Sequence, residues 1–153
     1  SYYGGLTINI AGLGYVHAFA HQIGAKYRIP HGLSNAKVLP YILAFNKFAA
    51  TERMAEMAIF LGLGTANESE LELAEKFTIA VKKLINTIGI EAKIPQIKQL
   101  DHSSIIQAAF KEANSTYAVA KYMSYDEAEL IFLPDLFRER YDPNLSITRR
   151  PRH

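Results

Sequence analysis

The amino-acid sequence predicts an all-α fold, built as a helical bundle, and three observations support this prediction. Apolar residues recur with the 3.6-residue period of an amphipathic helix along most of the chain. Residues typical of helix ends flank these periodic segments. The alternating pattern of a strand occurs only in one short segment, LTINI at residues 6–10. A chain of 153 residues can bury one hydrophobic core, so a single domain is expected.

The first two helices are expected at residues 13–27 and 32–46. Four apolar residues of the first follow the helical period: Leu13, Val16, Ala20 and Ile23. Pro30 disfavours helical backbone in the residue before it, so this helix must end by about Arg28. Pro40 lies inside the second helix, where a kink or a short first half is expected.

The third helix is expected at residues 51–64. Four of its apolar residues share one face: Met54, Met57, Ala58 and Leu61. Gly62 and Gly64 are expected to end it, because glycine accepts the backbone conformation common at helix C-termini.

The last three helices begin with capping patterns. They are expected at residues 67–89, 100–114 and 124–137. Asn67 and Glu70 have the spacing of a capping box at the first of them. Ser124 and Glu127 have the same spacing at the last. Asp101 is the expected N-cap of the helix between them.

The net charge of +2 comes from the C-terminal end of the chain. Residues 138–153 contain five Arg, Glu139 and Asp142, a net charge of +3, which leaves −1 for the rest. This basic segment is interpreted as a solvated tail and not as a nucleic-acid-binding face. The chain has no Cys, which excludes disulfides, thiolate metal sites and a Cys nucleophile, and is compatible with a cytoplasmic location.

The first 25 residues carry no charge, Lys26 being the first charged residue. A membrane span is not expected, because polar residues and five glycines interrupt the segment. A signal peptide is not expected either, because the basic start is missing. An uncharged segment of this kind is typical of chain buried on several sides within a protein.

Three of the five histidines lie close together in the sequence. His17 and His21 are four residues apart, which on a helix puts them on one face with Cβ atoms about 5–6 Å apart. His31 stands at the start of the next helix, and a helix–turn–helix of this length can bring it back toward His17. Ala20 and Gly24 on the same stripe are small enough to let another backbone or a ligand come close.

Two interpretations of this cluster stay open from the residues alone. Neutral imidazole is a common ligand of Fe, Zn, Cu and Ni, so the cluster can be a metal site, or it can be three polar residues on a half-buried face. The HExxH pattern is absent, since Ala18 follows His17, and GLGYVH at residues 12–17 lacks the third glycine of a dinucleotide-binding motif. His102 follows the expected N-cap Asp101 and is predicted to lie on the surface.

Residues 11–46, AGLGYVHAFAHQIGAKYRIPHGLSNAKVLPYILAFN, closely resemble the signature of the iron-containing (group III) alcohol dehydrogenases. That signature reads roughly G-x2-H-x2-A-H-x2-G followed by P-H-G-x-x-N-A-x-x-L-P. The matching residues are Gly14, His17, Ala20, His21, Gly24, Pro30, His31, Gly32, Asn35, Ala36, Leu39 and Pro40. IGIEAKIPQI and YDEAELIF also look like later segments of such enzymes, so the resemblance extends to about Tyr141.

The resemblance implies a helical bundle like the C-terminal domain of these enzymes, whose fold is dehydroquinate synthase-like. Residues 1–141 are expected to form this metal-binding domain, and residues 142–153 a basic C-terminal tail. In the family, a separate N-terminal α/β domain binds NAD or NADP. That domain is missing from the sequence, so the chain is expected to be the C-terminal part of a larger enzyme.

The resemblance also implies the site residues. The family holds a divalent metal, usually Fe(II), through an Asp and three His, and Zn(II) or another divalent ion is an alternative. By position, His17 and His31 are metal ligands. His21 lies near the nicotinamide and the proton path, which makes it the catalytic and cofactor-contacting residue. The remaining ligands belong to an upstream D-A-x-x-H type motif that this sequence lacks.

The predicted function is therefore the C-terminal portion of a metal-dependent, NAD(P)-linked alcohol dehydrogenase that interconverts alcohols and aldehydes or ketones, inactive as an isolated chain. In the whole enzyme the metal polarises the alcohol oxygen, and a base such as His21 accepts or relays the proton. The expected partners are a small alcohol or aldehyde and the missing dinucleotide-binding domain, with no nucleic acid and no membrane; a homo-oligomer is left open. Two alternatives are a non-catalytic helical interaction module and an independent three-His metal-binding domain.

Overall fold

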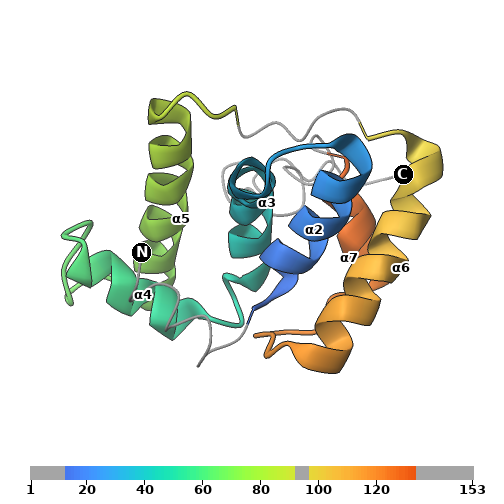
Figure 1. Cartoon of the computed structure of the whole chain (residues 1–153). Helices are drawn as coiled ribbons and strands as arrows, with labels where there is room; N and C mark the ends of the chain where they lie inside the picture. Colours follow the sequence, from blue (N-terminus) through green and yellow to red (C-terminus); the bar gives the residue numbers. More distant parts are fainter. Residues whose placement is uncertain (1–12, 92–96, 134–153) are drawn as a thin grey trace, which may run out of the picture.

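The computed structural model describes residues 13–91 and 97–133, and every regular element in these two ranges is an α-helix (Figure 1). With the labels of Figure 1, the helices are α2 (Tyr15–Tyr27), α3 (His31–Asn46), α4 (Thr51–Phe60), α5 (Glu70–Thr87), α6 (Gln99–Thr116) and α7 (Tyr125–Leu130). The predicted all-α fold is confirmed. The candidate strand at residues 6–10 and the basic tail lie outside the described residues.

The helices pack around two hydrophobic cores. The larger core lies between α2, α3, α6 and α7, and Phe19, Ile42 and Ile106 are among its fully buried side chains. The smaller core lies between α4 and α5 and includes Leu73 and Phe77. Figure 1 accordingly shows α4 and α5 at one side of the molecule, with α5 next to α3 and with α2 next to α6.

The end of α2 agrees with the prediction from Pro30. Arg28 adopts the left-handed conformation, with φ 54° and ψ 39°, and its N–H donates to the carbonyl oxygen of Gly24. The N–H of Ile29 donates to the same oxygen at 3.1 Å. These bonds satisfy a carbonyl that the helix end would otherwise leave unpaired. The chain then turns at once, and α3 begins at His31.

Helix α3 runs without interruption through Pro40, so the expected short first half is not found. Proline removes one backbone donor from the helix, a loss that tertiary packing can offset. Val38, Ile42 and Phe45, on both sides of Pro40, are each at most 3% exposed and belong to the larger core. Burial of this face keeps the two halves of α3 in one helix.

The predicted start of α5 at Asn67 is wrong. The capping box is formed by Ser69 and Glu72, and each side chain accepts a hydrogen bond from the backbone N–H of the other. Before it, the carboxylate of Glu68 accepts a hydrogen bond from the N–H of Thr65 at 2.9 Å. This turn includes Asn67, so the helix begins after it. At the start of α7, by contrast, the predicted capping box is confirmed.

Asp101 is not the N-cap of α6, and that prediction is also wrong. Lys98 is the N-cap, and Asp101 lies within the first turn of the helix. Its carboxylate accepts hydrogen bonds from Lys26 Nζ at 2.8 Å and from the hydroxyl of Tyr27 at 2.7 Å. Because both donors come from the end of α2, Asp101 joins α6 to α2 instead of capping its own helix.

His102 is buried, with 4% of its surface exposed, although the sequence predicted a surface position. Its ring packs on Phe132 with centroids 4.8 Å apart, and its Nδ1 lies 3.3 Å from Glu129 Oε1. Both partners come from the α7 region, which the sequence did not place against α6. The apolar face predicted for α4 is only partly correct, because Met57 and Leu61 are 48% and 55% exposed.

None of the helices in the described ranges has the length and apolar character needed to cross a membrane.

Candidate functional site

Three histidine rings gather between α2 and the first residue of α3. The ring centroids of His17 and His21 are 5.8 Å apart, one turn of α2 from each other. The ring of His31 lies 5.5 Å from that of His17 and 5.2 Å from that of His21. The prediction that the turn returns His31 to the His17 side is therefore confirmed.

Gly24 allows the close approach of the two helices. A Cβ atom at this position would lie 3.0 Å from Ser34 Oγ and 3.1 Å from the carbonyl oxygen of Ile29. Ser34 is 1% exposed and faces α2 from the first turn of α3. A larger residue in place of Gly24 would push α3, and with it His31, away from the rings on α2.

One ring nitrogen of His31 is unprotonated, and its lone pair accepts a hydrogen bond. Its Nε2 lies 3.1 Å from Asn35 Nδ2, and the same amide nitrogen donates to the carbonyl oxygen of His31 at 2.9 Å. Because an amide NH₂ group can only donate, Nε2 of His31 acts as the acceptor. A metal ion requires the same unprotonated form, and it would displace the Asn35 amide from this nitrogen.

Burial lowers the pKa of His17, and the neighbouring His21 and His31 lower it further, while Glu112 acts in the opposite direction. The neutral imidazole is therefore favoured at neutral pH. Neutral imidazole is the form of histidine that binds metals.

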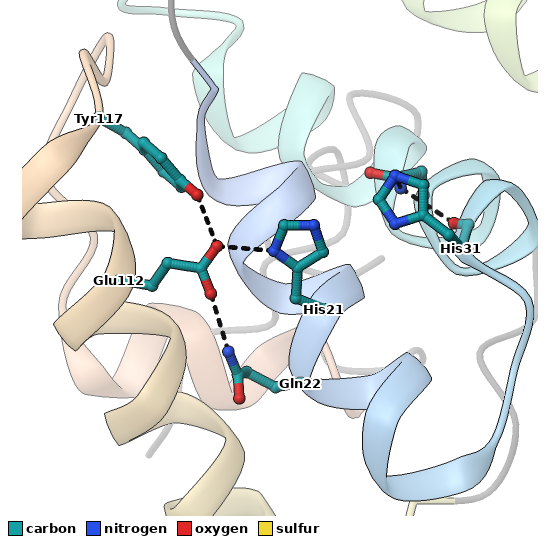
Figure 2. A network of polar contacts seen from close by, with 6 residues as sticks. His21, Gln22, His31, Glu112 and Tyr117 are labelled. Carbon is teal, nitrogen blue, oxygen red and sulfur yellow. Dashed lines mark hydrogen bonds and ion pairs between the residues drawn. The ribbon is translucent and has the colours of Figure 1, made fainter.

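The opposite side of His21 meets a carboxylate from α6 (Figure 2). Glu112 Oε1 lies 2.7 Å from His21 Nδ1 and accepts a hydrogen bond from the Tyr117 hydroxyl at 2.6 Å. Its Oε2 accepts from Gln22 Nε2 at 2.9 Å. Burial alone would raise the pKa of Glu112, but the hydrogen bonds from Tyr117 and His21 outweigh it and the pKa is lowered. Burial, together with the bond to Glu112, raises the pKa of Tyr117 to about 12.

Sequence reasoning missed Glu112 and Tyr117. Glu112 is 91 residues from His21, and no motif links them. In the sequence, Glu112 is simply a charged residue on a predicted helix, and nothing near it distinguishes it from a charge exposed to solvent.

A pocket of about 380 Å³ opens beside His17. Its mainly apolar wall is formed by Leu13, Gly14, Tyr15, Val16, His17, Asn35, Ala36, Leu39, Ile42 and Asn46. The Oδ1 atoms of Asn35 and Asn46 are buried and have no hydrogen-bond partner in the described part of the chain. The volume falls within the range of about 300–1,000 Å³ typical of small-molecule sites. The pocket can thus take a small molecule with an apolar body.

The three imidazoles fit a divalent metal by their chemistry, but they do not complete a site. Across residues 13–91 and 97–133, no group of three or more His, Asp or Glu side chains is placed to hold a metal ion. His21 Nδ1 cannot serve as a further metal ligand, because that nitrogen is hydrogen-bonded to Glu112. Catalytic zinc sites use about three protein ligands and structural ones about four. The described residues therefore do not supply a complete donor set.

The chain is similar to enzymes of known activity. Residues 1–133 match the model of the Fe-containing alcohol dehydrogenase family, C-terminal. The chain is 37% identical over 113 residues to the 1,3-propanediol dehydrogenase of Klebsiella pneumoniae, covering 72% of this chain and 29% of that protein. It is 33% identical over 113 residues to the NAD-dependent methanol dehydrogenase of Bacillus methanolicus, covering 72% of this chain and 30% of that protein.

Solved structures agree with the sequence comparison. The alcohol dehydrogenase from Oenococcus oeni superimposes with a TM-score of 0.77 at 35% identity, over 85% of this chain and 34% of that one. A crystal structure of 1,3-propanediol oxidoreductase gives a TM-score of 0.69 at 34% identity, over 80% of this chain and 32% of that one. The chain thus spans about a third of the length of its relatives, at their C-terminal part.

Proposed function

Because this chain belongs to the Fe-containing alcohol dehydrogenase family and matches its C-terminal part, we propose that it is the metal-binding portion of an NAD(P)-linked enzyme that interconverts alcohols with aldehydes or ketones. The observation that carries the proposal is the gathering of His17, His21 and His31, with ring centroids 5.2–5.8 Å apart. A cytoplasmic location goes with this proposal.

In this function His17 and His31 hold the metal, Fe(II) or alternatively Zn(II). The unprotonated state of His31 Nε2, from which a metal ion would displace the Asn35 amide, and the neutral state favoured for His17 support the assignment. When bound, the metal polarises the substrate oxygen as a Lewis acid. The remaining ligands come from outside the described residues, in keeping with a chain that spans about 30% of its dehydrogenase relatives.

His21 serves as the base that accepts or relays the substrate proton and lies near the nicotinamide. Its ring stacks on that of His31 at 5.2 Å, so a proton released beside the metal ligands is within its reach. The apolar pocket next to His17 suits the body of a small alcohol or aldehyde. The nicotinamide itself supplies the hydride chemistry, and this chain's residues supply geometry.

Anaerobic titration of the purified chain with Fe(II) and with Zn(II) tests the metal assignment. We expect weak binding that is lost in His17→Ala and in His31→Ala but kept in His21→Ala. Unchanged affinity in the first two variants would contradict the assignment. Tight one-to-one binding that disappears in His21→Ala would instead favour an independent three-His metal domain.

We expect the isolated chain to be catalytically inactive, because two ligands and one base do not make a complete dehydrogenase. Incubation with a short alcohol, NAD or NADP, and Fe(II) should give no reduced nicotinamide. Steady formation of reduced cofactor by the 153-residue chain, absent in His17→Ala, would overturn this expectation.

An interaction role is a second candidate, and the surface of α4 favours it. Several apolar side chains on or beside α4 are exposed: Phe48, Met57, Ile59, Phe60 and Leu61. Phe60 alone is 89% exposed. We propose that these side chains form one apolar surface, and surfaces of this kind mark interaction sites. We propose that the dinucleotide-binding part of the whole enzyme, or a second copy of the chain, covers this surface. A monodisperse monomer that stays soluble at high concentration would count against it.

A further inference from the structure

The contact between His21 and Glu112 determines which nitrogen of His21 carries the proton. Glu112 Oε1 lies 2.7 Å from His21 Nδ1. An ionised carboxylate can only accept a hydrogen bond, so Nδ1 of the neutral ring must carry the hydrogen. The other nitrogen, Nε2, then keeps its lone pair. In Figure 2 the ring stands with Nδ1 toward Glu112 and with His31 on its other side.

The carboxylate of Glu112 is itself fixed in place. The Tyr117 hydroxyl donates to Oε1 at 2.6 Å, and Gln22 Nε2 donates to Oε2 at 2.9 Å. Both oxygens are therefore engaged, and the group cannot rotate without losing a hydrogen bond. Its side chain is 24% exposed, so these charge-assisted bonds are partly shielded from water. The arrangement ties α6 and the loop after it to α2.

We propose that Glu112 is a positioning residue for His21: it holds the ring in the Nδ1-protonated tautomer and leaves Nε2 as an acceptor beside the histidine cluster. A base needs a free lone pair to take a proton, and the bond from Nδ1–H to a carboxylate steadies the ring while it does so. The statement that Nε2 accepts the substrate proton rests on the proposed function. The tautomer, however, is a property of this chain alone.

Long-range proton–nitrogen correlation NMR of the ¹⁵N-histidine-labelled chain tests the proposal, at about pH 8 so that histidines with ordinary pKa values are neutral. The His21 signals are identified by their loss in His21→Gln. We expect Nδ1 to be protonated and Nε2 unprotonated in the unmodified chain. In Glu112→Ala this assignment should be lost, because nothing then holds the proton on Nδ1. A protonated Nε2 in the unmodified chain, or an unchanged tautomer in Glu112→Ala, would overturn the proposal.

Glu112→Gln is the conservative variant. Its amide oxygen can replace Oε1, and Gln22 can rotate its own amide to accept from the new NH₂ group. The tautomer should therefore be kept, while the resonance of the Nδ1-bound proton moves upfield because a neutral acceptor binds it more weakly. An unmoved proton resonance would show that Glu112 is not its partner, and this holds even if Glu112→Ala does not fold. Metal affinity that is unchanged in His17→Ala and His31→Ala would refute the proposed function and leave the tautomer result standing.

Discussion

Replacing Gly24 with alanine tests the close contact that brings α3 to the histidines of α2. The new Cβ atom would lie 3.0 Å from Ser34 Oγ and 3.1 Å from the carbonyl oxygen of Ile29. Forcing an extra carbon into a packed position costs about 1–3 kcal/mol. Alanine in place of glycine within a helix returns about 0.8–1.0 kcal/mol. The free energy of unfolding should therefore fall by about 1 kcal/mol.

Gly32→Ala is the matched control. Gly32 lies in the first turn of α3, and a Cβ atom there would meet nothing within 4 Å. Only the gain in helix propensity and the loss of unfolded-state freedom remain, so this variant should be stabilised by about 0.4–1 kcal/mol. The two variants carry the same chemical change but should move in opposite directions.

Urea unfolding followed by far-ultraviolet circular dichroism measures both variants, with the stability obtained by linear extrapolation. The expected separation between the two is about 2 kcal/mol, which is well above the uncertainty of paired measurements. If Gly24→Ala is stabilised as much as Gly32→Ala, then α2 and α3 are not in tight contact at Gly24, and the reasoning about the position of His31 fails.

Three further predictions concern charge and backbone conformation. Lys47 is 4% exposed and pairs with Glu75. Glu75→Ala should lower the free energy of unfolding by about 3–5 kcal/mol because it leaves a buried ammonium unpaired, whereas Lys47→Met should lower it less. Equal losses of the two variants in urea unfolding would refute this. Arg28→Gly should stabilise the chain by about 0.5–1 kcal/mol in thermal melts, since Arg28 has φ 54°, and a lower melting temperature would contradict it. The pKa of Tyr117 is raised to about 12 from 10.0, so the stability contributed by its protonated hydroxyl is complete below pH 10 and is lost as the pH rises through 12. Glu112→Gln should lower the pH at which Tyr117 ionises. An ultraviolet titration that Tyr117→Phe leaves unchanged near pH 12 would refute this.

The sequence by itself determined the helices and the histidine cluster, because both depend on short-range geometry. The helical period and Pro30 locate α2 and the turn after it within a few residues. The spacing of His17 and His21 is one turn of helix, and the short connection brings His31 back to them. The family signature depends on the same local segment, and the comparisons confirmed it.

Helix caps were predicted less well, because they depend on neighbours outside the helix. Ser69 replaces Asn67 as the cap of α5, since the preceding turn is held by Glu68. Asp101 was a good N-cap candidate by residue type, but its carboxylate binds Lys26 and the end of α2 instead. A polar side chain near a helix start can bond either its own backbone or a neighbouring element. Tertiary packing decides which partner is closer, and the sequence does not give that distance.

Only the tertiary structure decided the surroundings of the candidate site. Glu112 meets His21 across 91 residues of sequence because α2 and α6 bury their apolar faces in one core. The same packing buries His102 against Phe132. Contacts of this kind are fixed by the sum of many weak interactions over the whole core, so they cannot be predicted from any single pair of residues in the sequence. Spacing along the chain therefore determined which histidines gather, and the packing of distant helices decided which nitrogen of His21 faces them.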